Sequence, residues 1–453
     1  MPGEYLMNFP LDDLTSSDWQ TRRTAVERLL KQADPHTLEQ LLRVLKERQD
    51  DLGLLNAALQ VLQRNALPVI ATLAELLRDE DTDTRIYAAQ ALGQFGHAAA
   101  VPLLLDALED PDPNVRYHAI DSLGQLRAVQ AVPALREYLQ TPDFFLTFPA
   151  IEALAAIGDP SVLPDLLPLL DDAILSPAVV DALGSIGTPR EIPHLLTWMA
   201  APHADVLLGC RALVRLAERF PSPAGRVPGL VRTGMPPQTR QRLLQVAAGG
   251  AAQGIEDVIT VLGWLEGRDV QRALVALLRN ESSRPIAARA LQGMGPQALP
   301  VVLESLPETE DSVRVHLVRI LGSWGDARAV PALITLLGSG TASVVTEAAA
   351  ALGKIGARES FDALLQQLRH PSGLVRRAVV AAINSLGHPE HTRRLLPLAQ
   401  DPDPRVRAAV IDSLGYFAAP EAEKTILQAL TDPTEIVQLA AVKALGVLDT
   451  PRA

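Results

Sequence analysis

Two stretches of the sequence decide the fold. They are DPDPNVRYHAIDSLGQLRAVQAVPALREYL at 110–139 and DPDPRVRAAVIDSLGYFAAPEAEKTILQAL at 401–430. Aligning the units on the Leu of the Ala-Leu-Gly motif, or on the residue at the same position where the motif differs, gives anchors about 30 residues apart, a period typical of solenoids. The anchors are Leu92, Leu123, Leu154, Leu183 and Leu213, then Leu291, Leu321, Leu352, Ile383, Leu414 and Leu445, with weaker ones at Leu29 and Val61.

Each unit has the pattern of two short helices. In the first stretch, Asp112 and Pro113 provide an N-cap and a favoured first helical residue, and apolar residues recur at helical spacing from 114 to 126. A second helix follows over 132–139. We expect left-handed helix stops at Gly96, Gly158, Gly187, Gly325 and Gly356. Glycines also recur inside the first helices, which predicts one close helix–helix contact per repeat.

One such helix pair cannot bury its apolar stripe alone, so neighbouring pairs must stack. The sequence therefore predicts an all-α protein, a right-handed superhelical α-solenoid of roughly fourteen to fifteen helix pairs without strands. The expected organisation is residues 1–219 and 281–453 as regular repeats, joined by 220–280 as irregular repeats or a hinge in one solenoid. Two abutting domains are the alternative for that middle stretch.

The unit D-x-x-x-V-R…A-L-G…I-G…A-V-P-A-L resembles the short bacterial HEAT repeats, the type also found in E/F-type phycobilin lyases. The resemblance extends from about Asp12 to Leu448. It implies a non-enzymatic scaffold or adaptor for protein partners, and the alternative that it implies is a chromophore lyase or isomerase, or a subunit of one. The sequence departs from HEAT-repeat deoxyhypusine hydroxylases, because none of its nine histidines is followed by glutamate.

Composition excludes several classes of function. Lys and Arg number 41 against 53 Asp and Glu, a net charge of −12, which disfavours a nucleic-acid partner. The single cysteine, Cys210, excludes a disulfide framework and is expected to be a buried small side chain. The N-terminal residues lack a signal-peptide pattern, and no apolar run is long enough for a membrane span. We expect a cytoplasmic protein without membrane insertion.

Catalytic motifs are sparse. The tightest group of metal-ligand residue types is His388, Glu390 and His391, and we interpret it as part of a solvated loop at a turn. No cofactor, metal or catalytic residue is assigned.

An arginine seven residues before the anchor recurs in many units, among them Arg85, Arg116 and Arg407. We predict a ladder between stacked repeats in which these arginines pair with Asp81, Asp112 and Asp403, each four residues ahead. Three consecutive repeats hold another residue at the arginine position. These replacements are Thr147, Ser176 and Val206.

Prolines interrupt the first helix of three repeats, at Pro149, Pro177 and Pro285. Because proline is tolerated only in the first turn of a helix, we expect these helices to begin late. Residues 141–148 would then form a connector, and Ser176 would be an N-cap.

The same region gathers aromatic residues in a chain with only 4% aromatics. We predict a protein-binding surface here, because aromatic side chains are favoured anchors at interfaces. The alternative is that these side chains fill space between irregular repeats. The candidate residues are Tyr138, Phe144, Phe145, Phe148 and Trp198.

The C-terminal helix, expected from Glu435 to Leu448, is apolar nearly all round. An exposed apolar patch usually marks an interaction site. We therefore predict that this end docks a second copy or a partner through Leu439, Val442 and Leu448. The alternative is that it packs back on the preceding repeat.

Overall fold

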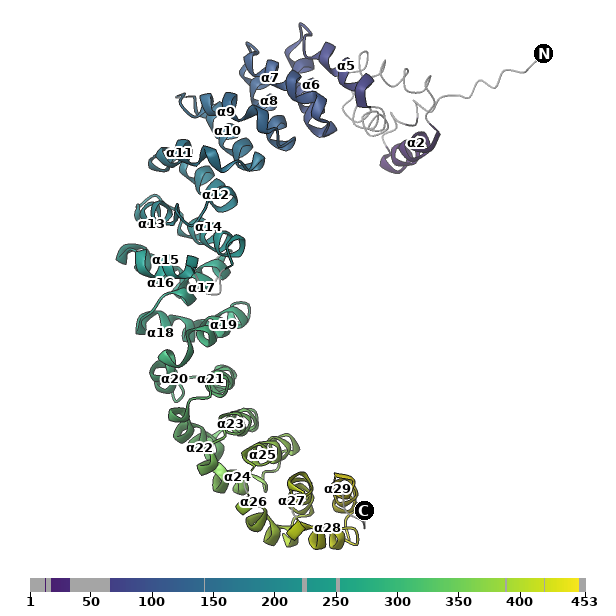
Figure 1. The fold of residues 1–453 in the computed structure, drawn as a ribbon, viewed down its shortest axis with the longest axis vertical. Coiled ribbons are helices and arrows are strands. Elements are labelled where there is room, and N and C mark those ends of the chain that lie inside the picture. The colour runs from purple at the N-terminus through teal and green to yellow at the C-terminus, as the bar shows by residue number, and fades with distance from the viewer. Residues whose placement is uncertain are drawn as a thin grey trace, which may run out of the picture. The chain divides into compact units, whose positions relative to one another are not determined.

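The computed structural model describes residues 13, 18–32, 66–141, 143–221, 226–249, 253–387, 389–418 and 420–447. Within these ranges every regular element is a helix and none is a strand, which confirms the predicted all-α solenoid. The chain divides into two compact units, residues 1–230 and 231–453. Figure 1 shows that helices alternate between two rows within each unit. Each repeat contributes a first helix to one row and a second helix to the other.

The described part of unit 1 contains α2, α5, four regular pairs from α6 to α13, and α14. Its first helices are α6 (Thr82–Phe95), α8 (Pro113–Gln125), α10 (Phe144–Ile157), α12 (Ser176–Ile186) and α14 (Val206–Arg219). Its other helices are α2 (Trp19–Gln32), α5 (Ala66–Leu76), α7 (Val101–Asp106), α9 (Val132–Tyr138), α11 (Leu163–Leu166) and α13 (Ile192–Ala200). The short α15 (Arg226–Gly234) contains the boundary between the units.

Unit 2 continues the same alternation. Its first helices are α17 (Ile255–Trp264), α19 (Arg284–Met294), α21 (Asp311–Trp324), α23 (Ala342–Ile355), α25 (Gly373–Leu386), α27 (Pro404–Phe417) and α29 (Glu435–Val447). Its other helices are α16 (Pro237–Gly249), α18 (Arg268–Leu277), α20 (Leu299–Ser305), α22 (Val330–Ser339), α24 (Phe361–Gln367), α26 (Pro389–Leu395) and α28 (Glu423–Ala429). In both units short 3-10 turns flank many second helices, for example Ala98–Ala100 before α7 and Leu396–Gln400 after α26.

Local sequence explains where the helices begin and end. The Asp112 and Asp403 carboxylates accept hydrogen bonds from the amides of Asn114 and Arg405, as expected of N-caps. Four of the five predicted glycine stops have a positive φ, namely Gly96, Gly158, Gly325 and Gly356. The prediction for Gly187 is wrong, because its φ is −61° and its backbone is extended.

The glycines inside the first helices make the predicted close contacts. A Cβ atom on Gly124 would lie 2.7 Å from the Ala153 Cα atom of the next first helix, and one on Gly353 would lie 2.9 Å from Ala382 Cα. Gly93, Gly184, Gly322 and Gly415 make equivalent contacts. Stacking of first helices therefore depends on the absence of a side chain at this position.

Within the described residues, the arginine ladder is present in two places, but with different aspartates from those predicted. Arg85 donates two hydrogen bonds to Asp110, at 2.9 and 3.1 Å, and Arg407 donates two to Asp432, both at 2.8 Å. Asp81, Asp112 and Asp403 are N-caps instead. Each carboxylate accepts a hydrogen bond from a backbone amide at the start of its own helix. The partner aspartate lies at the end of the second helix of the same repeat, beside the start of the next repeat.

The prolines give mixed results. As predicted, α12 and α19 begin late, at Ser176 and Arg284. The prediction for Pro149 is wrong, because α10 begins at Phe144 and runs through the proline. Asp143 caps this helix by accepting a hydrogen bond from the Phe145 amide, and burial of Leu146 holds its first turn in place. Ser176 is not an N-cap, since it lies inside α12 and its hydroxyl makes no hydrogen bond.

The stretch over 220–280 is helical in its described part, with α16, α17 and α18 following the sequence periodicity. The repeat unit could not be recognised from the sequence here, but α17 packs like the other first helices. A Cβ on Gly263 would lie 2.9 Å from the Ala290 Cβ. This contact between α17 and α19 is of the same kind as the glycine contacts between the other first helices.

His391 corrects the interpretation of the histidine cluster. It lies in the short helix α26 rather than in a solvated loop, and its ring is buried and stacks on Phe361 at 3.8 Å. Across the described ranges, no group of three His, Cys, Asp or Glu side chains is placed to hold a metal ion. His388 lies outside the described residues. Cys210 is buried, as expected.

Candidate functional site

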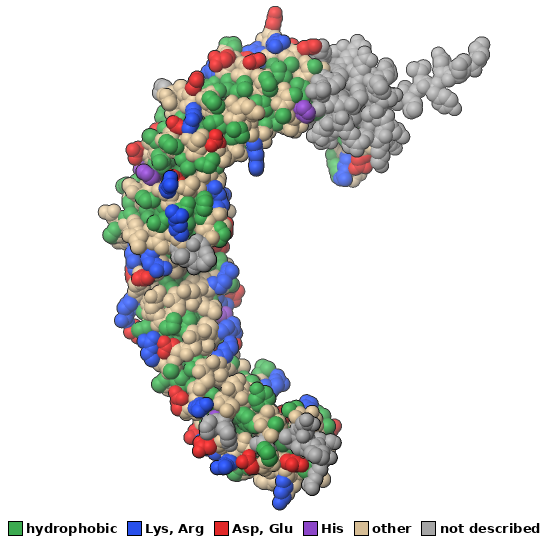
Figure 2. All heavy atoms as spheres, in the orientation of Figure 1, with side chains coloured by type: hydrophobic (Ala, Val, Ile, Leu, Met, Phe, Trp, Pro, Cys, Tyr) green, Lys and Arg blue, Asp and Glu red, His purple; other side chains and the backbone are tan. Residues whose placement is uncertain are grey.

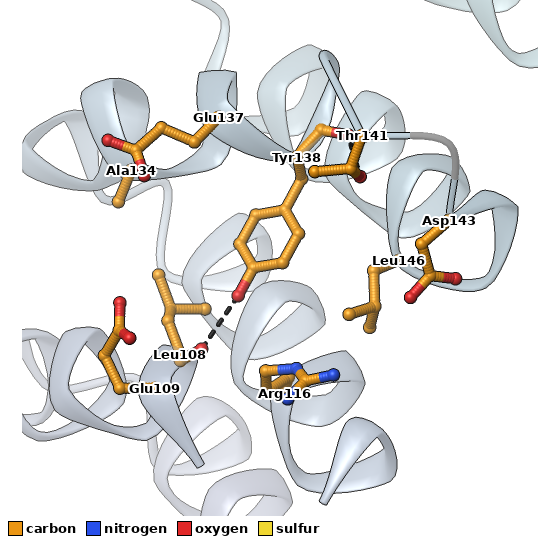
Figure 3. Close-up of a pocket in the computed structure, with 9 residues that line it drawn as sticks. All are labelled: Leu108, Glu109, Arg116, Ala134, Glu137, Tyr138, Thr141, Asp143 and Leu146. Atoms are coloured by element: carbon orange, nitrogen blue, oxygen red, sulfur yellow. Dashed lines mark hydrogen bonds between the residues drawn. The ribbon is translucent and has the colours of Figure 1, made fainter. Parts of the chain in front are cut away.

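A pocket with a volume of about 350 Å³ opens between α8, α9 and α10 in unit 1 (Figure 3). The Tyr138 ring stands at its centre, between Leu108, Arg116 and Leu146. The Tyr138 hydroxyl donates a 2.8 Å hydrogen bond to the Leu108 carbonyl. Burial raises the pKa of this phenol, so it stays protonated and remains a donor at neutral pH.

The pocket lies where a ladder arginine, Arg116, has no aspartate at the position of the usual ladder partner. Arg116 occupies the ladder position of α8, but Thr141 stands where Asp110 and Asp432 stand relative to their arginines. The Arg116 guanidinium donates to the Asp110 carbonyl at 2.9 Å and, within the described ranges, forms no ion pair. It therefore lines the pocket with donor capacity that the ladder does not use.

Thr147, which replaces the next ladder arginine, contacts two of the residues that line the pocket. The Thr147 hydroxyl lies 2.9 Å from the carbonyl oxygens of both Tyr138 and Asp143, so it ties the end of α9 to the start of α10. Glu109, Glu137 and Asp143 supply carboxylates at the rim. The pocket thus combines donors, acceptors and an aromatic wall, which suits the binding of a polypeptide segment.

Three phenylalanines extend from α10 into solvent next to this pocket. Phe144, Phe145 and Phe148 are 46%, 48% and 38% exposed, although phenylalanine is usually buried. Phe145 also contacts Tyr117 of α8, with 5.4 Å between ring centroids. None of the three lines the pocket itself, but Asp143 and Leu146 of the same helical end do.

One predicted site residue, Trp198, does not lie on the same exposed surface as the three phenylalanines. Trp198 in α13 is only 5% exposed and belongs to the core, so it is not part of an accessible surface. Its space-filling role follows from the apolar face of α13, which buries Leu195, Leu196 and Met199 as well. Tyr138 is half-buried in the pocket, and the three phenylalanines remain exposed.

Sequence reasoning missed Arg116 and Tyr117 as parts of this region. The signal for Arg116 is that Thr141 stands at the position where other repeats have the aspartate that pairs with the ladder arginine. This signal can be recognised only once the structure shows that Arg85 pairs with Asp110. Tyr117 precedes a histidine in an otherwise regular repeat, and nothing in its spacing indicates a contact with Phe145.

The C-terminal helix α29 presents a second exposed apolar face. Leu439 and Val442 are 52% and 58% exposed, and Ile436 and Val447 are exposed beside them. Val437, Ala440, Ala441 and Ala444 form the buried face. A Cβ on Gly446 would meet no atom within 4 Å, although the equivalent Gly415 is packed against Ala444. Leu448 lies outside the described residues.

The family model for HEAT repeats matches residues 70–147, 149–213, 299–384 and 392–453, and the chain belongs to this family. Among curated proteins none matches the chain. In the part of the chain that the structure describes, no helix is both long and apolar enough to cross a bilayer.

Several solved structures match this chain. The karyopherin Kap121p bound to RanGTP matches with a TM-score of 0.53 and 15% identity over 97% of this chain and 56% of that chain. Kap121p bound to Ste12p matches with a TM-score of 0.53 and 13% identity over 97% and 56%. The complex of CpcE and CpcF of phycocyanin lyase from Nostoc sp. PCC7120 matches with a TM-score of 0.32 and 25% identity over 51% of this chain and 91% of that chain.

Proposed function

We propose that this chain is a non-enzymatic protein-binding scaffold and that a protein partner contacts Phe144, Phe145 and Phe148. The observation that carries the proposal is the exposure of three phenylalanines at one end of α10, beside a pocket with unused hydrogen-bonding capacity. Aromatic side chains contribute strongly to binding when a partner desolvates them. The HEAT-repeat solenoid is compatible with this role.

The pocket supports the proposal by supplying specificity next to the aromatic surface. Arg116 offers donors, the rim carboxylates offer acceptors, and Tyr138 forms a fixed wall. Polar groups placed around an apolar contact fix the orientation of a bound segment. We expect the partner to place a polar side chain or a terminus in this pocket while apolar side chains cover the phenylalanines.

The test is a pull-down from the native cell extract with wild-type protein and with the double variant Phe144→Ala and Phe145→Ala. We expect a specific partner to be retained by the wild type and lost by the variant, while circular dichroism shows unchanged helix content. The matched control is Val129→Ala with Ile174→Ala, which removes two apolar side chains elsewhere in unit 1 that are at least as exposed. Retention of the partner by the phenylalanine variant would place the binding surface elsewhere.

The lyase alternative has its own readout. Incubation of the chain with a bilin and an apo-phycobiliprotein would produce a covalent adduct with a new visible absorbance band if the chain were a chromophore lyase. We expect no such band.

A further inference from the structure

Unit 2 holds a second cavity, which is separate from the surface described above. It has a volume of about 470 Å³ and lies against α19, α21 and α23, all first helices. Ala288 and Ile320 contribute apolar surface to it. Arg284, His316, Arg319 and Lys354 surround that surface, and none of the described residues that line the cavity is an aspartate or glutamate. Figure 2 shows basic side chains along this edge of unit 2.

A change in the repeat sequence explains why the cavity exists. Before and after α19, glycine allows first helices to touch: Gly263 faces Ala290, and a Cβ on Gly322 would lie 2.8 Å from Ala351. In α19 the equivalent residue is Gln292, and Gly293 beside it has no atom within 4 Å of a built Cβ. The glutamine side chain cannot fit a contact of that kind, so a gap remains beside α19, and Gln292 lines it.

The charges around the cavity are only partly neutralised. Arg319 pairs with Glu347 of α23, with its Nε 3.4 Å from the carboxylate. Arg284 donates from Nε to the Leu278 carbonyl at 2.8 Å, and a carbonyl leaves its positive charge in place. Lys354 is exposed and forms no ion pair with the described part of the chain. Burial and the charges of Arg319 and Arg284 lower the pKa of His316, which adds a neutral hydrogen-bonding ring.

We propose that this cavity binds an acidic segment of a protein partner, with a carboxylate near Arg284 and Lys354 and an apolar side chain on Ala288 and Ile320. A basic rim around an apolar floor is complementary to a peptide in which acidic and apolar residues alternate. A nucleic acid fits less well, because its closely spaced phosphates need an extended basic surface, and this chain has a net charge of −12.

The proposal does not rest on the phenylalanine surface, which lies in the other unit. Either site can therefore fail without the other. If both hold, the scaffold engages partners at two places with different chemistry, one aromatic and one basic.

The test uses the full chain and a fluorescein-labelled peptide of alternating Glu and Leu, with binding followed by fluorescence anisotropy. We expect saturable binding that weakens as salt rises from about 50 to 300 mM, because added ions screen exposed charges. A peptide with Gln in place of Glu should bind at least about tenfold more weakly. A labelled single-stranded DNA provides the nucleic-acid comparison.

Two variants separate the role of charge from the role of shape. Lys354→Glu reverses an exposed charge and should weaken peptide binding by about fivefold or more. Ala288→Phe fills the cavity floor without changing charge and should weaken binding to a similar extent. Lys424→Glu, which changes an exposed side chain of α28 in the same unit, is the matched control and should bind like the wild type.

Three outcomes would overturn the proposal. The first is absence of saturable binding of the acidic peptide up to about 1 mM. The second is equal binding by wild type, Lys354→Glu and Ala288→Phe at unchanged helix content. The third is tighter binding of DNA than of the acidic peptide, which would make this a nucleic-acid site.

Discussion

Single glycines determine how closely the first helices stack. Gly322 in α21 and Gly293 in α19 test this, because a Cβ on Gly322 would lie 2.8 Å from Ala351 whereas one on Gly293 would touch nothing. We expect Gly322→Ala to destabilise unit 2 by about 1–3 kcal/mol through overpacking. Gly293→Ala should be neutral or stabilising by up to about 1 kcal/mol, because alanine favours helix. Urea unfolding followed by circular dichroism measures both, and equal effects would contradict the close-contact interpretation.

The ion pair between Arg407 and Asp432 gives stability a pH dependence. The two hydrogen bonds from Arg407 lower the pKa of Asp432 below 3.8, so the pair stabilises the fold above that pH and loses its effect as pH falls through the lowered pKa. We expect Asp432→Asn to lose about 1–3 kcal/mol at pH 7. The difference from wild type should shrink towards zero between about pH 4 and pH 2, measured by unfolding at each pH. A difference that stays constant over this range would show that the loss does not come from the charge of Asp432.

At the scale of the element, helix periodicity and capping could be read from the sequence, whereas the behaviour of each proline depends on its surroundings. Pro177 and Pro285 begin their helices as expected. Pro149 lies inside α10, because the Asp143 cap and the buried Leu146 and Ala150 extend the helix ahead of it. Tertiary burial of this kind outweighs local propensity and is invisible to spacing alone.

This difference between prolines predicts opposite responses to substitution. Pro149→Ala restores an amide that can donate to the Phe145 carbonyl one turn back and removes a cost of about 3 kcal/mol for proline in a helix interior. Loss of two buried methylenes offsets about half of this. We therefore expect Pro149→Ala to raise the melting temperature. Pro177→Ala, at the start of α12, should not raise it, because proline is favourable there.

At the scale of the whole molecule, the repeat period predicted the fold, but only part of the candidate site. The phenylalanines could be found because aromatic residues are scarce elsewhere. Trp198 could not be distinguished from them, because burial depends on how α13 packs. The basic cavity was missed because it results from the loss of one helix contact at Gln292, and the sequence alone does not show which glycines make such contacts.

The exposed face of α29 predicts association of whole chains. Several other first helices of unit 2 have a glycine directly after the anchor residue. Each of these glycines faces the following first helix, as Gly415 faces Ala444. Gly446 is open, and Leu439 and Val442 are exposed beside it. Burying one such side chain stabilises an interface by about 1.5–3 kcal/mol, so a second copy covering this face would associate measurably. We expect light scattering to give a mass above that of the monomer, rising with protein concentration.

Changing Leu439 and Val442 to Glu should lower this mass to that of the monomer while helix content stays unchanged, because two buried carboxylates would oppose association. The control adds the same number of carboxylates without removing apolar surface, through Lys424→Glu and Gln428→Glu on the exposed side of α28. This control should associate like the wild type, unless association depends on charge repulsion alone. A monomeric mass for the wild type at every concentration would show that the face of α29 does not join two copies of this chain.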